Sequence, residues 1–181
     1  MLRGVEYLMT YEQCQLFENE KYEDKRGFFF ESFGRKISVD LDVNFYQDNC
    51  SFSKKGVIRG LHYQWEKPMG KFITVPMGKI IDTVVDIRHK SPTFGKPKYY
   101  ELSSENNQSL WIPAGFAHGF EAMEDSLVIY KCSSFYNSEC EASINFLDKD
   151  LNLNIYNNNA IMSDRDKEAI SFRDYCEDPK F

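Results

Sequence analysis

The sequence predicts a mainly β protein, an antiparallel sandwich or barrel with short helices near its C-terminal end. Many short segments have strand character, turn signals separate them, and no helical hydrophobic period lies between them. Aromatic residues make up 15% of the chain, and such side chains suit pleated, half-buried surfaces. A chain of 181 residues is long enough to bury one core, so we expect a single domain over residues 1–181.

The N-terminal region carries weaker signals than the middle of the chain. Residues 5–17 leave strand and irregular structure both open. Lys25, Arg26 and Gly27 form a turn, and the run FFFESF that follows predicts a strand over 28–33. A mixed polar stretch over 34–44 is compatible with a short helix.

The rest of the chain predicts strands in close succession. They cover residues 45–52, 56–64, 70–77, 79–88, 97–103, 108–113, 117–123, 126–136 and 141–146. Turn signals between them include Met77-Gly78 and the Ser91-Pro92 pair. Ser163 begins a Ser-x-x-Asp pattern, in which the hydroxyl caps free amides, so one or two short C-terminal helices are expected.

Composition narrows the class of protein. The net charge of −6 does not indicate a nucleic-acid-binding surface, and an anionic small ligand would need a local basic cluster. No apolar run approaches a membrane span and the N-terminus lacks a signal-peptide pattern, so we expect no membrane partner and a cytoplasmic location. Five widely spaced cysteines without a C-x-x-C pair indicate reduced thiols that serve mainly in packing.

Residues 47–64, QDNCSFSKKGVIRGLHYQ, carry the strongest functional signal. Strand alternation places Arg59 on one face and Ile58, Gly60 and His62 on the other. An imidazole on a rigid strand beside a glycine is a suitable base. A buried histidine satisfied by a carbonyl is the commoner interpretation of a lone strand histidine, so this segment alone leaves both open.

Further motifs give the chain a specific resemblance. They are DKRGFFFE (24–31), the 47–64 segment, Gly70-Lys71, VVDIRHKSPTFGK (84–96), IPAGFAHGF (112–120), YKCSSFY (130–136) and SDRD (163–166). In these segments and their order the chain resembles the dTDP-4-dehydrorhamnose 3,5-epimerase family. The resemblance implies a cupin jelly roll that epimerises nucleotide-linked 4-keto-6-deoxy sugars at C3 and C5.

The chemistry of such a reaction requires particular residue types. A proton next to a ketone can be removed because the resulting carbanion delocalises onto oxygen, and inversion needs a base and an acid on opposite faces of the sugar. By the resemblance His62 is the base, Asp166 its carboxylate partner, Tyr130 the acid, and Lys71 the cation at the ketone oxygen. Without the resemblance, the simpler interpretations are a solvated helix charge for Asp166, a core residue for Tyr130 and a surface lysine for Lys71.

The resemblance also implies a set of substrate-binding residues and a homodimer. Arg26 and Arg59 would pair with the pyrophosphate of a nucleotide-diphosphate sugar, with the Arg26 segment supplied by the partner subunit. The other implied ligand contacts are Phe29, Glu31, Gln47, Asn49 and His118.

No metal or redox cofactor is expected. The chain has three histidines and no H-x-H pair, which leaves too few ligands for a cupin metal site. Met69 stands where the family usually carries Gln, and Phe135 where a Tyr is common, so the sugar-facing wall is not standard. This leaves open a thymidine or guanosine nucleotide, a hexose or heptose, and inversion of C3, C5 or both. A 3,4-ketoisomerase, a non-catalytic sugar-nucleotide-binding cupin and a metal-dependent oxygenase are the rival functions.

Overall fold

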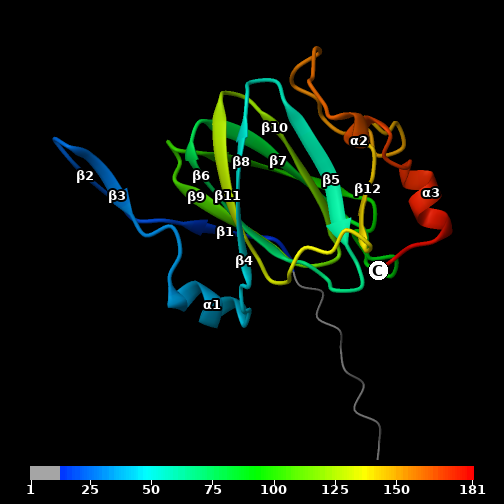
Figure 1. The fold of residues 1–181 in the computed structure, drawn as a ribbon, viewed down its shortest axis with the longest axis horizontal. Coiled ribbons are helices and arrows are strands. Elements are labelled where there is room, and N and C mark those ends of the chain that lie inside the picture. The colour runs from blue at the N-terminus through cyan, green and yellow to red at the C-terminus, as the bar shows by residue number, and fades with distance from the viewer. Residues whose placement is uncertain (1–12) are drawn as a thin grey trace, which may run out of the picture.

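In the computed structural model, which describes residues 13–181, two five-stranded antiparallel sheets pack face to face (Figure 1). Sheet A has the strand order β1-β9-β6-β11-β4, and sheet B has the order β12-β5-β10-β7-β8. This architecture confirms the mainly β jelly-roll prediction. The strands of sheet A are β1 Gln15–Glu18, β9 Gln108–Ile112, β6 Lys71–Met77, β11 Ser126–Cys132 and β4 Gln47–Ser53. The strands of sheet B are β12 Glu141–Ser143, β5 Ile58–Gln64, β10 Phe116–Ala122, β7 Lys79–Asp86 and β8 Pro97–Ser103.

The N-terminal region forms a hairpin that projects from the body of the molecule (Figure 1). Its strands are β2 Lys21–Asp24 and β3 Gly27–Phe30, joined by the predicted turn. The strand predicted over 28–33 therefore ends early, because Glu31 and Ser32 leave the hairpin. Of the undecided segment 5–17, residues 5–12 lie outside the described part, and the remainder enters β1. The short helix expected over 34–44 is α1, Arg35–Leu41.

Apolar side chains fill the space between the sheets. The buried cluster there draws on both sheets: Ile73, Val75, Ile80, Val84, Leu102, Leu110, Ile112, Phe116, Phe120, Ala122 and Val128. Alternate residues of β6 belong to it, as strand geometry requires of a sheet whose inner face is the core.

The C-terminal segment covers the outer face of sheet B. Its helices are α2 Asp164–Lys167 and α3 Phe172–Glu177, as the sequence predicted for this region. Ser163 caps α2 by accepting a hydrogen bond from the backbone N–H of Asp166 at 3.1 Å. The buried Tyr175 ring and Met162 pack with outward-facing residues of β5 and β7 in a second core cluster.

The alternation predicted along β5 breaks at Gly60. Ile58 and Leu61 both belong to the outer cluster of sheet B, so the prediction that Ile58 shares a face with His62 is wrong. The pairing of β5 with β10 shifts register there, and a bulge of this kind resets which face each residue occupies. A Cβ atom at Gly60, where φ is +105°, would lie 2.6 Å from the Cα of Gly119, so only glycine permits this approach.

The outer face of sheet A is covered only in part. Around α1 it carries a small cluster of Leu41, Phe72 and Trp111. Farther along this sheet Phe52, Met77 and Ile129 are 48%, 46% and 37% exposed. No helix within residues 13–181 is long and apolar enough to cross a membrane.

Candidate active site

One cavity between the sheets brings together four of the residues that the sequence singles out. His62 comes from β5 and His118 from β10 of sheet B, while Lys71 comes from β6 and Tyr130 from β11 of sheet A. All four line both of two adjoining pockets that make up this cavity, the first reaching Met69 and Glu141 and the second Ser51 and Arg59. His62 and His118 are register partners on adjacent strands, which places the two imidazoles side by side.

His62 is held by a carboxylate from the far end of the chain. Its Nε2 lies 2.7 Å from Oδ1 of Asp166, which is buried at the start of α2. Burial raises the pKa of the Asp166 carboxyl, but hydrogen bonds from His62, Ser163 and the backbone of Gly60 hold it below its ordinary value. An ionised carboxylate only accepts, so Nε2 carries the proton and Nδ1 is left as the basic nitrogen.

Tyr130 faces the cavity from the opposite sheet. Burial raises the pKa of its phenol, although a hydrogen bond with Asn49 lowers it in part. Asn49 is the register partner of Tyr130 on β4, and its own amide oxygen accepts from Gln47 Nε2 at 2.9 Å. The phenol therefore stays protonated at neutral pH and can donate a proton into the cavity.

Lys71 lies between the two sets of groups. Its Nζ is 5.9 Å from the ring centroid of Tyr130. Burial lowers the pKa of this ammonium, with nearby negative groups opposing the change. No carboxylate among residues 13–181 forms an ion pair with it. A desolvated cation of this kind attracts negative charge that develops on a ligand oxygen.

His118 forms a second imidazole–carboxylate pair. Its Nε2 lies 2.8 Å from Oδ2 of Asp82, which is fully buried on β7. Burial lowers the pKa of His118, an effect that the Asp82 carboxylate opposes. Asp82 is not among the residues predicted from the sequence, although a carboxylate inside the apolar run IIDTVVD is itself a signal of a buried polar contact.

Arg59 lines the second of these pockets. Its Nε donates to Ser53 Oγ at 2.9 Å and its Nη2 to the carbonyl of Phe52 at 3.1 Å. The side chain is exposed, so the remaining donors of its guanidinium are available to an anion. Gln47 contacts the wall of the first pocket, because its Oε1 accepts from the backbone N–H of Tyr136 at 3.0 Å.

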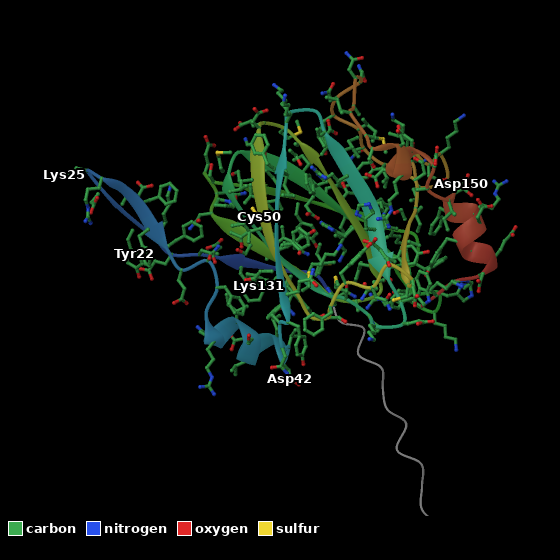
Figure 2. All side chains as sticks on the ribbon, in the orientation of Figure 1. Tyr22, Lys25, Asp42, Cys50, Lys131 and Asp150 are labelled. Atoms are coloured by element: carbon green, nitrogen blue, oxygen red, sulfur yellow. The ribbon has the colours of Figure 1, made fainter. Side chains whose placement is uncertain are left out.

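Three predicted ligand contacts lie away from this cavity. Arg26, Phe29 and Glu31 belong to the projecting hairpin and the residues just after it. Figure 2 shows the hairpin side chains Tyr22 and Lys25 reaching outward, far from the interior between the sheets. The Arg26 side chain is 84% exposed and pairs with Asp24, and Phe29 is 68% exposed. Within one chain, these residues do not join His62.

The cavity wall also contains residues that the sequence analysis missed or left unassigned. Glu141 and Tyr136 line it, and Glu141 accepts from Arg165 of α2 at 2.5 Å. Met69, at the position where Gln is usual, lines the same wall. Within residues 13–181, no three His, Cys, Asp or Glu side chains group closely enough to hold a metal ion.

A jelly roll with an imidazole–carboxylate pair, a phenol and an ammonium around one cavity provides the base, the acid and the oxyanion-stabilising cation that an acid–base isomerase requires. The particular family follows from comparison: the family model of dTDP-4-dehydrorhamnose 3,5-epimerase matches residues 9–174. The chain belongs to this family.

Curated relatives and solved structures agree with that assignment. A dTDP-4-dehydrorhamnose 3,5-epimerase of Shigella flexneri is 44% identical over 88% of this chain and 91% of its own length. A Legionella pneumophila epimerase, solved with dTDP-4-keto-L-rhamnose, has a TM-score of 0.84 and 42% identity over 87% of each chain. A 3′-monoepimerase of Streptomyces bikiniensis, solved with dTDP-quinovose, has a TM-score of 0.85 and 29% identity, over 92% of this chain and 87% of that one.

Proposed function

We propose that this protein inverts C3 and C5 of a thymidine-diphosphate-linked 4-keto-6-deoxy sugar through an enolate, with His62 as base and Tyr130 as acid. The observation that carries the proposal is the position of these two groups in one cavity, on strands of facing sheets. Membership of the epimerase family supports the same reaction.

In the first half-reaction, Nδ1 of His62 takes the proton from the carbon next to the ketone. The electrons of that C–H bond form a carbon–carbon double bond, and the ketone oxygen becomes an enolate beside the Lys71 ammonium. Asp166 stabilises the imidazolium that forms and keeps the ring in position, since it bonds Nε2 at 2.7 Å.

In the second half-reaction, the Tyr130 phenol delivers its proton to the opposite face of the same carbon. The electron pair of the carbon–carbon double bond forms the new carbon–hydrogen bond on that face. The ketone is thereby restored and the configuration is inverted. Water then takes the proton from His62, which is 27% exposed, and a proton returns to the phenolate. Each inversion therefore places one solvent hydrogen on the sugar, without metal or redox chemistry.

The nucleotide is proposed to bind along the second pocket, which Arg59 lines. Arg59 has exposed guanidinium donors there, which suit pyrophosphate oxygens. Arg26, Phe29 and Glu31 are proposed to line the cavity of a partner subunit, because they lie away from the cavity of their own chain. The exposed apolar residues Phe52 and Ile129 on sheet A support burial of that face in a homodimer.

Exchange of sugar hydrogens with solvent tests the reaction. We expect dTDP-4-keto-6-deoxyglucose, incubated with the protein in deuterium oxide, to gain deuterium at both C3 and C5 by NMR. Exchange at C3 alone would instead support a single-centre epimerase, a function favoured by the likeness to the 3′-monoepimerase. Binding without exchange would support a sugar-nucleotide-binding cupin. The guanosine-linked heptose counterpart, assayed in parallel, tests the choice of nucleotide and sugar.

Mixing two inactive variants tests the shared site. His62→Asn removes the base and Arg26→Ala removes the proposed partner contact. In a mixed dimer, one cavity combines an intact His62 with an intact Arg26 segment from the other subunit. After equal mixing and subunit exchange, half of the dimers are mixed, and each mixed dimer has one complete site out of two. The mixture should therefore recover about one quarter of wild-type activity. No recovery, with mixed dimers demonstrated by mass spectrometry, would contradict a contribution from the partner.

A further inference from the structure

The inner face of sheet A changes from polar to apolar across the cavity. One row of paired residues runs Gln47, Cys132, Lys71 and Ile112 across β4, β11, β6 and β9. Register partners on one face have Cβ atoms about 5 Å apart, so each side chain of this row neighbours the next. The order is amide, thiol, ammonium and aliphatic group, with the cation between a polar and an apolar side.

The next row along the strands also changes from polar to apolar. Asn49 on β4 and Tyr130 on β11 are followed by Ile73 on β6 and Leu110 on β9. Sheet B adds to the polar side, because Gln64 and Glu141 line the cavity from β5 and β12. On sheet B the polar side is formed by β12 and β5, while β10 contributes both the apolar Phe116 and the His118 imidazole.

The apolar side is formed by Ile112 and Phe116. They flank a Pro-Ala-Gly turn between β9 and β10, and both line the cavity although they are only 2% and 6% exposed. The guanidinium carbon of Arg88 lies 4.4 Å from the centroid of the Phe116 ring. Neither side chain offers a hydrogen bond, so this wall suits an apolar group.

A 4-keto-6-deoxy sugar has a matching asymmetry about its ketone. With the C4 oxygen at Lys71, C3 with its hydroxyl lies on one side and C5 with the C6 methyl on the other. Sugar hydroxyls that face Asn49 and Glu141 can form hydrogen bonds with these side chains. Hydroxyls that face Ile112 would lose the hydrogen bonds that they make with water and gain none. Only one of the two orientations satisfies both sides.

We propose that Ile112 and Phe116 form the subsite for the C6 methyl group, which sets the orientation of the sugar ring and selects 6-deoxy sugars over their 6-hydroxy counterparts. This assignment rests on the proposed epimerase function. It makes the two residues determinants of specificity, with no part in proton transfer.

The test compares two substrates that differ in one oxygen atom. The rate of deuterium exchange at C5, as kcat/KM, is measured for dTDP-4-keto-6-deoxyglucose and for dTDP-4-keto-glucose. Wild type should prefer the 6-deoxy sugar by about 10- to 100-fold, the range that an apolar pocket achieves against an added hydroxyl. Ile112→Thr, which adds a hydroxyl to this wall, should reduce that preference at least about fivefold.

Cys132→Ser is the matched control, because it makes a similar polar change on the other side of Lys71 in the same row. Its preference ratio should equal that of wild type whatever happens to the absolute rate. Should Ile112→Thr fail to fold, Phe116→Leu enlarges the same subsite and should also narrow the preference.

The outcomes separate this inference from the function on which it rests. An unchanged ratio in folded, active Ile112 or Phe116 variants overturns the subsite and leaves the epimerase function intact. A wild-type ratio of kcat/KM near one for the two substrates would also overturn the subsite and leave the epimerase function intact. Wild-type protein that exchanges neither substrate would overturn the proposed function and the subsite with it.

Discussion

The cavity contains two imidazole–carboxylate pairs that are nearly alike in contact and different in surroundings. The nitrogen–oxygen distances are 2.7 Å for His62 with Asp166 and 2.8 Å for His118 with Asp82. The side chains of the first pair are 27% and 6% exposed, and those of the second 10% and 0%. Access to water, rather than the contact itself, separates the two.

The carboxylates also differ in their other partners. Asp166 is further stabilised by Ser163 and the backbone of Gly60, whereas Oδ1 of Asp82 is buried without a hydrogen-bond partner among residues 13–181. Asp82 comes from the strand next to His118, while Asp166 comes from a helix 104 residues beyond His62. The first pair suits repeated proton exchange with solvent, and the second suits a neutral imidazole held in a fixed position.

Replacing the two imidazoles separately gives the largest expected contrast. His62→Asn should lower C5 exchange by at least about 10³-fold, because the proposed base is lost, while dTDP affinity by calorimetry stays within about tenfold. A greater loss of exchange in His118→Asn than in His62→Asn would reverse the proposed roles.

Removing the charge from the Asp166 carboxyl tests how far the first pair depends on its carboxylate. Asp166→Asn should reduce kcat about 10²-fold, since the amide neither fixes the imidazole tautomer nor stabilises its charged form. Asp164→Asn is the control on the same helix, at a carboxylate that is 92% exposed. Equal rates for the two variants, both folded by circular dichroism, would argue against the dyad.

The second pair should matter less for the rate. His118→Gln keeps a donor for Asp82 but moves it, and we expect kcat/KM for exchange to fall about tenfold through poorer substrate positioning. Steady-state kinetics would show the loss mainly in KM. A drop confined to kcat and as deep as that of His62→Asn would contradict a positioning role.

The smallest expected effect is on stability as a function of pH. Burial lowers the pKa of His118, so the unfolded chain takes up this proton at a higher pH than the folded protein does. The stability that depends on the neutral imidazole is complete above about pH 6.5 and is lost as the pH falls through the lowered pKa. The free energy of unfolding, measured by urea titration, should fall between about pH 7.5 and about pH 5 in wild type. His118→Gln should remove the part of this fall that His118 causes. An unchanged pH slope would contradict it.

Much of the fold follows from the sequence because the strands of both sheets carry strong periodic signals. The strand predicted over 97–103 matches β8, and Ser163 begins α2 as its capping pattern predicts. Some ends were wrong: the strand predicted over 126–136 stops at Cys132, and the one over 141–146 stops at Ser143. Beyond these ends only isolated backbone pairing continues, from Ser133 to Gly70 and between Ile144 and Leu61, and local propensity does not report where a ladder stops.

The parts that the sequence does not predict depend on tertiary contacts. The bulge beside Gly60 needs the backbone of Gly119 on a neighbouring strand, so alternation alone misplaced Ile58. His62, Lys71, His118 and Tyr130 do share a cavity, but family resemblance rather than pattern singled them out. Asp82 was missed because a lone carboxylate gives no sign of its partner until strands β7 and β10 are paired.

The position of Asp166 on α2 has a consequence for biosynthesis. Both sheets and every other residue assigned to the cavity precede residue 147 in the chain, whereas the carboxylate that holds His62 is translated after all of them. A nascent chain still held by the ribosome would therefore have a formed pocket and an unaligned imidazole. Full turnover would require α2 to dock on the outside of sheet B and bring Asp166 to His62.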